Sequence, residues 1–487
     1  MHELTIKRRV IHWIRHNLYF FFAGLACIVW FLFRTGTKPS RVEYPCQQAS
    51  MAGAQLWFAV YLYPLVSIVR PQLNGRDQVN LLLIAGVVLA IALIGAWYFF
   101  GHGNPEPFTE EVAPPAVPSD IFVVNGTSGN DGGVTRLLNL MEREGTPFYA
   151  VRNGTSVPGL IAQDDVVIIK INSQWDERGG TNTDLVRELI QAIVDHPDGF
   201  TGEIIVADNG QAQNGPANTG GSMDYVKNNA MDTSQSMTRV VSSFSPHYRV
   251  STCLWDTITT TQVNEYAEGD MNDGFILNAT RNPTTGIIVS YPKFQTRYGT
   301  YVSFKNGIWD TENRTYDTDR LKIINAPVLK AHNQMGVSGA VKNYMGVPTN
   351  KLTSRLRGAA HNSVDKGGMG TEMAGTRFPA ITILDAIWVN AVPGEGPATS
   401  YDIATRTNVI AASTDPIALD FWAAQNILMP TAESLGYTDL SSMDPENNSR
   451  GKFGNWLRLS MRELRKSGYN VTMDRNAMNV YVDGKNP

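Results

Sequence analysis

The pattern of apolar and polar residues divides the chain into two parts of different character. Residues 1–104 contain long apolar runs, whereas the apolar runs after residue 119 are short and alternate with polar or glycine-rich stretches. Residues 105–118 lie between the two parts and are rich in proline and acidic residues, a composition typical of an extended, semi-rigid spacer. The pattern predicts a membrane region, a tether and a soluble domain over residues 119–487.

Three apolar runs in the first part are candidate transmembrane helices. Leu18–Phe33 follows a basic amino terminus, and Asn80–Gly101 ends in a cluster of aromatic residues. Both are close to the ~20 residues that cross a bilayer. The middle run, 49–69, is a weaker candidate because it carries Gln55 and Pro64.

The number of spans decides on which side of the membrane the large domain lies. Because basic residues favour the cytoplasmic side, the amino terminus is expected in the cytoplasm. Two spans would then leave the domain in the cytoplasm, and three spans would place it outside. We favour three spans, and so expect a protein of a prokaryotic cytoplasmic membrane with its carboxyl-terminal domain outside the cytoplasm.

Short, continuous apolar runs rich in β-branched residues recur through the soluble part. Such runs are typical of strands buried on both faces, and therefore of parallel sheets. Between them, 134–144 and 183–194 have helical patterns with one apolar face, and Thr183 is the expected N-cap of the second. This alternation predicts an α/β fold, a mostly parallel sheet sandwiched by helices. The predicted strands are 121–124, 165–170, 203–208, 322–325, 381–385 and 408–412.

Residues 211–319 interrupt this alternation. They are rich in Ser, Thr, Asn and aromatic residues, and 287–291 and 300–304 have the composition of strands. The sequence Lys305-Asn-Gly307 after the second run is a turn signal. We expect a β-rich insertion that covers part of the main sheet.

The densest group of candidate functional residues lies in the segment 323–348. A strand is expected over 323–329, followed by a glycine-rich loop and a helical run. Ammonium groups and amides close to glycine suit a pocket that binds an anion. The residues concerned are Lys330, His332, Asn333, Lys342 and Asn343.

Polar residues also follow or end the other predicted strands. In open parallel sheets the ligand crevice lies at the carboxyl ends of the strands, so we expect these side chains to converge there. The lysines would bind an anion, and the aspartates would either hold a divalent metal through oxygen or neutralise the lysines. Asp415 precedes a proline and is equally well explained as a helix N-cap. The group comprises Lys170, Asn172, Asp208, Lys330, Asp385 and Asp415.

These residues fall into three expected roles. His332 and Lys330 are the catalytic candidates, although a histidine in this position is also explained as a metal ligand or a hydrogen-bonded loop residue. The metal candidates are Asp208, Asp385 and Asp415. The ligand-binding candidates are Lys170, Asn172, Asn333, Lys342 and Asn343.

Composition excludes some classes of function. The net charge is −4, so no general positive field attracts nucleic acid. The cysteines, Cys27, Cys46 and Cys253, lie far apart, which excludes the spacings of zinc and iron–sulfur sites. We therefore expect no iron–sulfur cluster, and the cofactor stays unknown apart from the divalent metal considered above.

Four motifs occur in the order found in the family called domain of unknown function 362, and the region they cover, about 120–430, resembles that family. The family has no assigned general activity. Some members carry ferredoxin-type cysteine clusters, which this chain lacks, so the resemblance implies no electron transfer here. The motifs are 168–172 with 181–184, 328–332 with 339–346, 383–387 with 394–397, and 413–420.

Two classes of function remain open. The favoured one is a membrane-anchored domain that binds an anionic ligand or a metal, with the lipid bilayer and further proteins of an envelope complex as partners. The alternative is a membrane-tethered enzyme that acts on an anionic small molecule or polymer through lysine, histidine and aspartate chemistry.

Overall fold

The computed structural model describes residues 117–151, 158–210 and 220–483. Every described residue belongs to one compact unit, Val112–Pro487. The predicted transmembrane runs, and the tether up to residue 116, lie outside the described residues. In the part that is described, no helix has both the length and the apolar character needed to cross a membrane.

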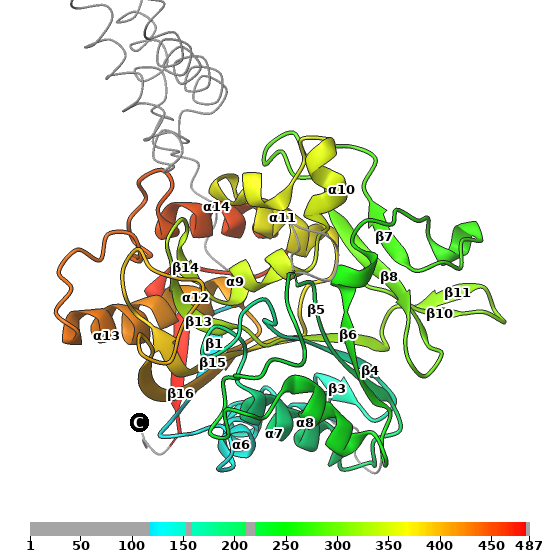
Figure 1. Ribbon diagram of the computed structural model, residues 1–487, viewed down its shortest axis with the longest axis horizontal. Helices are drawn as coiled ribbons and strands as arrows, with labels where there is room; N and C mark the ends of the chain where they lie inside the picture. Colours follow the sequence, from blue (N-terminus) through cyan, green and yellow to red (C-terminus); the bar gives the residue numbers. More distant parts are fainter. Residues whose placement is uncertain (1–116, 152–157, 211–219, 484–487) are drawn as a thin grey trace, which may run out of the picture. The chain divides into compact units, whose positions relative to one another are not determined.

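A sheet of ten described strands forms the centre of this unit (Figure 1). Most neighbouring strands are parallel, as predicted. Within the described strands, β16 and β14 run against their neighbours. The order is β17 (Met478–Val482), β1 (Ser119–Asn125), β16 (Thr405–Ser413), β15 (Ile381–Asn390), β12 (Leu321–Asn325), β4 (Val166–Lys170), β5 (Glu203–Asp208) and β6 (Val250–Leu254), with β13 (Val328–His332) joining β15 and β14 (Gly336–Ser338) joining β13.

Both faces of the sheet are buried, because alternate residues of each strand enter two separate cores. In β4, Val166 and Ile168 belong to one core, and Val167 and Ile169 to the other. The second core lies under helices α6 (Gly133–Arg143), α7 (Thr183–Val194) and α8 (Met237–Phe244) (Figure 1). The continuous apolar strands are therefore explained by helices on both sides of the sheet.

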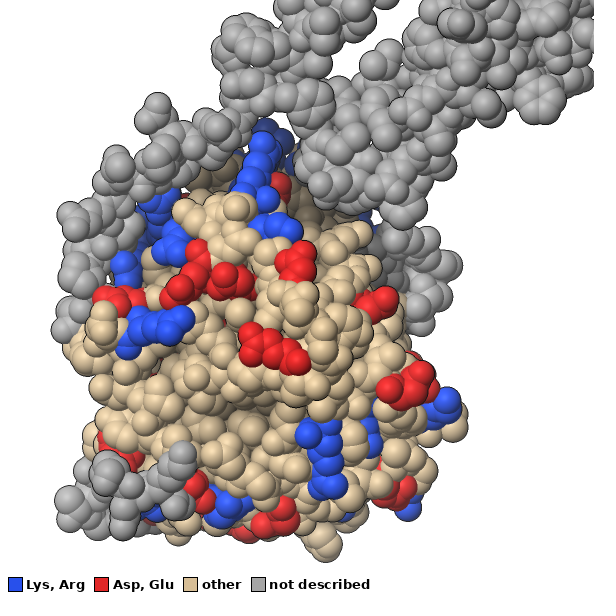
Figure 2. Space-filling model, turned by 90° about the vertical axis from the view of Figure 1, so that its left-hand side faces the viewer, with Lys and Arg blue, Asp and Glu red and all other residues tan. Residues whose placement is uncertain are grey.

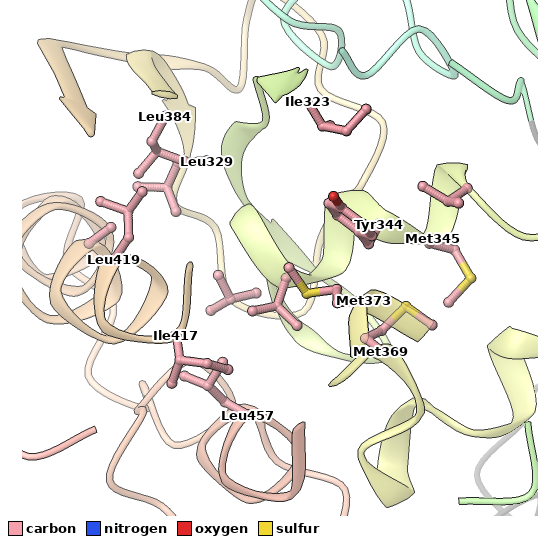
Figure 3. Close-up of a cluster of buried hydrophobic side chains, with 14 of the residues drawn as sticks. Ile323, Leu329, Tyr344, Met345, Met369, Met373, Leu384, Ile417, Leu419 and Leu457 are labelled. Atoms are coloured by element: carbon pink, nitrogen blue, oxygen red, sulfur yellow. The ribbon is translucent and has the colours of Figure 1, made fainter. Parts of the chain in front are cut away.

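The first core is covered by a second layer of helices. It contains α9 (Ala340–Asn343), the 3₁₀ turn η6 (Tyr344–Gly346), α11 (Gly368–Gly375), α12 (Pro416–Ala423) and α14 (Phe453–Lys466). Figure 3 shows Tyr344 and Met345 close to Met369 and Met373 of α11, with Leu457 of α14 nearby. The segment 323–348, which carries the densest group of candidate residues, is thus held between the sheet and two helices, α11 and α14, that come from later parts of the sequence.

The smaller sheet is antiparallel, and its strands occupy only part of the predicted insertion at 211–319. Its strands run in the order β11 (Thr315–Asp317), β10 (Gly307–Asp310), β9 (Tyr301–Ser303), β8 (Ser290–Gln295), β7 (Gly274–Leu277). Helix α8 and strand β6 fall within the predicted insertion at 211–319, but they belong to the main sheet and the helix layer that covers it. The turn between β9 and β10 lies at the predicted Lys305-Asn-Gly307.

Helix α7 has the predicted bounds but a different N-cap. The side chain of Asn182 accepts hydrogen bonds from the backbone N–H groups of Asp184 and Leu185. Thr183 is therefore the first helical residue, and its prediction as N-cap is wrong. The capping side chain is an asparagine, which satisfies amide groups of the first turn.

The strand predicted over 323–329 is two strands. β12 ends at Asn325 and β13 begins at Val328, with Ala326 and Pro327 between them. Proline has no N–H to continue the ladder of β12, and β13 pairs with the outer half of β15. Lys330 and His332 consequently lie in a strand and not in a loop.

The strand predicted over 408–412 runs in the opposite direction to that expected. β16 is antiparallel to both β1 and β15, so its carboxyl end lies at the edge where the parallel strands begin. Asp415 follows that end. Its Oδ1 accepts from the N–H groups of Ile417 and Ala418, and its Oδ2 from Ser119 Oγ at 2.6 Å and Thr472 N at 2.8 Å. Asp415 caps α12, and its predicted convergence with the other residues is wrong.

Candidate functional site

A cavity of about 310 Å³ opens at the carboxyl ends of β4 and β5. This is the location expected for a ligand crevice in a parallel sheet. All five ligand-binding candidates named from the sequence line it, together with one of the metal candidates and one of the catalytic candidates. They are Lys170, Asn172, Asp208, His332, Asn333, Lys342 and Asn343.

A buried ion pair forms the floor of the site. Lys170 Nζ lies 2.8 Å from Asp208 Oδ1, and the two side chains are 1% and 2% exposed. Lys170 also donates to the carbonyl of Ile171, and Asp208 Oδ2 accepts from the N–H of Ser173 at 2.8 Å. Burial lowers the pKa of Lys170 and raises that of Asp208, and their mutual attraction opposes both shifts.

Gly346 allows the chain to close over this pair. A Cβ atom at position 346 would lie 2.2 Å from Asp208 Oδ1 and 2.5 Å from Lys170 Nζ, closer than atoms can approach. A glycine at the end of η6 therefore lets the backbone contact both charged groups directly. This close approach is a physical reason for the last glycine of the segment 339–346.

Asp420 holds the helix that carries Lys342. Its two carboxylate oxygens accept from the N–H groups of Ala340 at 2.6 Å and Val341 at 2.9 Å, which are the first amides of α9. A Cβ atom at Gly339 would lie 2.2 Å from Asp420 Oδ1, so the close approach again requires glycine. Burial raises the pKa of Asp420 to about 7, while these hydrogen bonds favour the carboxylate.

Lys330 is a second buried lysine, 1% exposed. Its ammonium group donates to the carbonyl of Gly179 and is not part of the cavity wall. Burial, followed by the charge of Lys342, lowers the pKa of Lys330 to about 7, and the carboxylates of Asp208 and Asp385 oppose this shift. Lys330 therefore adds positive potential from behind the site.

Lys342 is the third lysine, and its charge is not compensated. Its side chain is 7% exposed and lines the cavity, and its Nζ forms no hydrogen bond or ion pair with any residue that the structure describes. Burial, followed by the charge of Lys170, lowers the pKa of Lys342 to about 8. Of the ammonium groups of Lys170, Lys330 and Lys342, that of Lys170 is in direct contact with a carboxylate, that of Asp208.

The hydrogen bonds of His332 determine what its ring can do. Its Nδ1 accepts from the N–H groups of Gln334 at 3.1 Å and Met335 at 3.3 Å. The neutral ring then carries its proton on Nε2 and is a hydrogen-bond donor. Burial, followed by the charges of Lys342 and Lys330, lowers the pKa of His332 to about 2. The ring is suited to donate to a ligand, and Nδ1 is not free to bind a metal.

Two asparagines on the cavity wall have unused acceptor atoms. Asn343 Nδ2 donates to Asn325 Oδ1 at 2.8 Å and to the carbonyl of Lys170 at 3.3 Å, which fixes the orientation of its amide. Its Oδ1 is buried and has no hydrogen-bond partner among the described residues. The same holds for Asn172 Oδ1. The site therefore offers acceptors as well as donors.

The three aspartates considered as metal ligands are not brought together. Asp208 pairs with Lys170, and Asp415 caps α12 at the other edge of the sheet. Asp385 lies within β15, which extends to Asn390, and its Oδ2 accepts from Asn182 N at 2.9 Å and Asn229 Nδ2 at 3.1 Å. Across residues 117–151, 158–210 and 220–483, no group of three or more His, Cys, Asp or Glu is placed to hold a metal ion.

Several residues that the sequence analysis did not assign to the site also contribute to it. Gln174, Trp175 and His361 line the cavity, and burial lowers the pKa of His361 to about 3. Gln174 and Trp175 lie shortly after Asn172, in the segment that follows β4. Their position after the carboxyl end of a predicted strand was the sequence feature that could have identified them as site residues.

The positive charge of the site is a local property. Figure 2 shows basic and acidic side chains mixed over the face it presents, with wide areas of other residues between them. This mixture agrees with the small net charge of −4. Attraction of an anion would therefore come from the buried lysines and not from a field of one sign over that face.

Comparison with known proteins confirms the family resemblance for the central segment. Residues 312–425 match the model of the family described as Domain of unknown function (DUF362), a range that includes Lys330, His332 and Lys342. The chain is also 30% identical over 129 residues to the thylakoid-associated protein sll1697 of Synechocystis sp., covering 25% of this chain and 39% of that protein. The chain thus spans about two fifths of the length of this relative. No solved structure matches.

Removal of the Asp208 charge should destabilise the protein strongly. In Asp208→Asn the ammonium of Lys170 stays buried without its counter-charge, and breaking a buried pair in this way costs about 3 to 5 kcal/mol of unfolding free energy. Urea unfolding of the full chain measures the loss.

The matched control is Glu177→Gln. Glu177 pairs with Lys227 at the same distance, 2.8 Å, but Lys227 is 61% exposed. This variant should unfold close to the wild-type midpoint, because surface ion pairs contribute little. Equal losses in the two variants would show that burial of the Lys170–Asp208 pair is not what matters.

Proposed function

We propose that the described unit, with its DUF362 match at 312–425, binds an anionic small molecule in the cavity beside Lys170 and Lys342. The observation that carries this proposal is the side chain of Lys342, which is 7% exposed, lines the cavity and forms no hydrogen bond or ion pair with the described residues. An isolated buried charge costs several kcal/mol unless it is paired. An anion in the cavity would supply the missing pair.

The other groups of the site support the same ligand class. His332 presents a donor through Nε2, and Lys330 adds positive charge from behind the wall. Lys170 is already neutralised by Asp208, so the anion would interact chiefly with Lys342. The volume of about 310 Å³ is in the range of small-molecule sites.

We also propose that the domain is held at a prokaryotic cytoplasmic membrane, outside the cytoplasm, as a component of an envelope complex. The support for this is the three apolar runs at 18–33, 49–69 and 80–101 and the basic amino terminus. The name of the Synechocystis relative, a thylakoid-associated protein, is consistent with a membrane-linked role.

An enzymatic function is the second candidate. The observation that favours it is the lowered pKa of two lysines, about 7 for Lys330 and about 8 for Lys342, which leaves a fraction of neutral amine near neutral pH. A neutral lysine in a cavity can act as a base or a nucleophile. His332 would assist as a hydrogen-bond donor and not as a base, because its Nδ1 accepts two backbone N–H groups.

Lys342→Met should weaken anion binding without weakening the fold. Methionine is close in size and removes an uncompensated buried charge, so the melting temperature should stay equal or rise. Loss of a charge-assisted contact should weaken the binding of inorganic phosphate by about 1.5 to 3 kcal/mol, as measured by calorimetry on the full chain.

The control for this variant is Lys366→Met, which removes an exposed lysine that does not line the cavity. It should bind phosphate like the wild type. If Lys342→Met also binds phosphate normally, the unpaired ammonium is not the anion site. If it melts at a much lower temperature, Lys342 has a structural partner and the proposal loses its main support.

Anion binding should weaken at alkaline pH. The ligand requires the protonated form of Lys342, whose pKa without ligand is about 8, and a bound anion would raise that pKa. Above about pH 8 the affinity for phosphate should therefore fall by up to about tenfold per pH unit, whereas phosphate itself keeps one proton and a constant charge up to about pH 10. An affinity that stays constant between about pH 8 and 10 would contradict a titrating lysine.

The membrane topology can be tested in spheroplasts of a bacterium that expresses the full chain. Protease added outside should digest the domain after residue 119, because three spans and a cytoplasmic amino terminus place it there. Protection of the domain until the cells are lysed would instead indicate two spans and a cytoplasmic domain.

A further inference from the structure

We propose that the ligand is an anion that also donates a hydrogen bond, such as hydrogen phosphate or a small phosphorylated compound with an adjacent O–H or N–H group. This inference rests on the proposed function and narrows its ligand class. It is carried by a separate observation, the unused acceptor Asn343 Oδ1, whose amide orientation is fixed by two hydrogen bonds; Asn172 Oδ1 is a second buried oxygen without a partner among the described residues.

The first step is that Asn343 cannot turn its donor group toward the ligand. Its Nδ2 is committed to Asn325 Oδ1 and the carbonyl of Lys170, at 2.8 Å and 3.3 Å. A flipped amide would place its carbonyl oxygen against those two acceptor oxygens and lose both bonds. The side chain is 5% exposed and lines the cavity, so Oδ1 is the atom left to face a ligand.

The second step is that the cations of the site do not satisfy these acceptors. Lys170 donates to the carbonyl of Ile171 and pairs with Asp208 Oδ1, and Lys330 donates to the carbonyl of Gly179. Lys342 forms no hydrogen bond with the described residues, including these two asparagines. Buried acceptors without partners are uncommon and costly, so a ligand that fills the site is expected to supply donors.

The third step concerns the carboxylates near the cavity. Asp208 is the cavity-lining acid, and both of its oxygens are engaged, Oδ1 by Lys170 and Oδ2 by Ser173. Recognition of a ligand proton therefore falls to neutral amides and not to a carboxylate. A neutral acceptor does not repel the anion, so it can select for an O–H beside a negative charge.

A matched pair of tetrahedral anions separates this inference from the proposed function. Between about pH 8 and 9 hydrogen phosphate and sulfate carry the same charge and have nearly the same size, but hydrogen phosphate retains an O–H. A site built to accept a hydrogen bond rejects the analogue that lacks it, because its buried acceptors then stay unpaired. Calorimetry on the purified full chain should give phosphate at least about tenfold tighter binding than sulfate.

A variant tests which atom makes the selection. Asn172→Ala removes one acceptor. The side chain of Asn172 forms no hydrogen bond with a described residue, so none is lost. The bond to Thr181 Oγ1 comes from the backbone N–H of residue 172, which alanine keeps. The preference for phosphate over sulfate should fall by at least about threefold. The control Asn426→Ala removes an exposed amide that does not line this cavity and should keep the wild-type preference.

The outcomes are distinguishable. Equal affinities for phosphate and sulfate, with both weakened in Lys342→Met, would overturn the donor inference and leave the anion site in place. No binding of either anion at about pH 7, where Lys342 is mostly protonated, would overturn the proposed function and this inference together. An unchanged preference in Asn172→Ala, with the variant folded as judged by its melting temperature, would remove Asn172 from the selection.

Discussion

The site depends on the burial of lysine ammonium groups at the carboxyl ends of β4 and β13, with one carboxylate in direct contact with one of them. Lys170 Nζ lies 2.8 Å from Asp208 Oδ1, so the carboxylate neutralises one of the ammonium groups. The pair also links β4 to its neighbour β5. Gly346 and Gly339 then allow the following segment to pack directly against charged side chains.

The positioning of Lys342 shows how the family segment and the rest of the chain cooperate. Asp420 holds the first amides of α9, and both lie within the matched range 312–425. Lys170 and Asp208, which supply the floor of the site, lie outside that range. The matched segment therefore contributes the unpaired cation, and the preceding βα units contribute its electrostatic surroundings.

The site combines an excess of positive charge with neutral acceptors. Lys342 and the Nε2–H of His332 are suited to an anionic group, and the two asparagine oxygens are suited to a donor on the same ligand. Asp385 and Asp415, in contrast, hold backbone and side-chain amides elsewhere in the fold. Charge alone does not distinguish these aspartates from Asp208; their hydrogen-bond partners do.

The sequence by itself determined where several of the strands and helices lie. The strands at β4 and β5, the helix α7 and the turn at Lys305-Asn-Gly307 were all predicted, because apolar periodicity and turn chemistry act within a few residues. The lysine-rich segment was also evident. Periodicity reports burial and not direction, however, so the antiparallel course of β16 and the resulting position of Asp415 depend on pairing with β1 and β15. That Lys342 has no partner among the described residues, and that Asn343 has a free oxygen, were decided by tertiary structure, since each depends on side chains that come from distant parts of the chain.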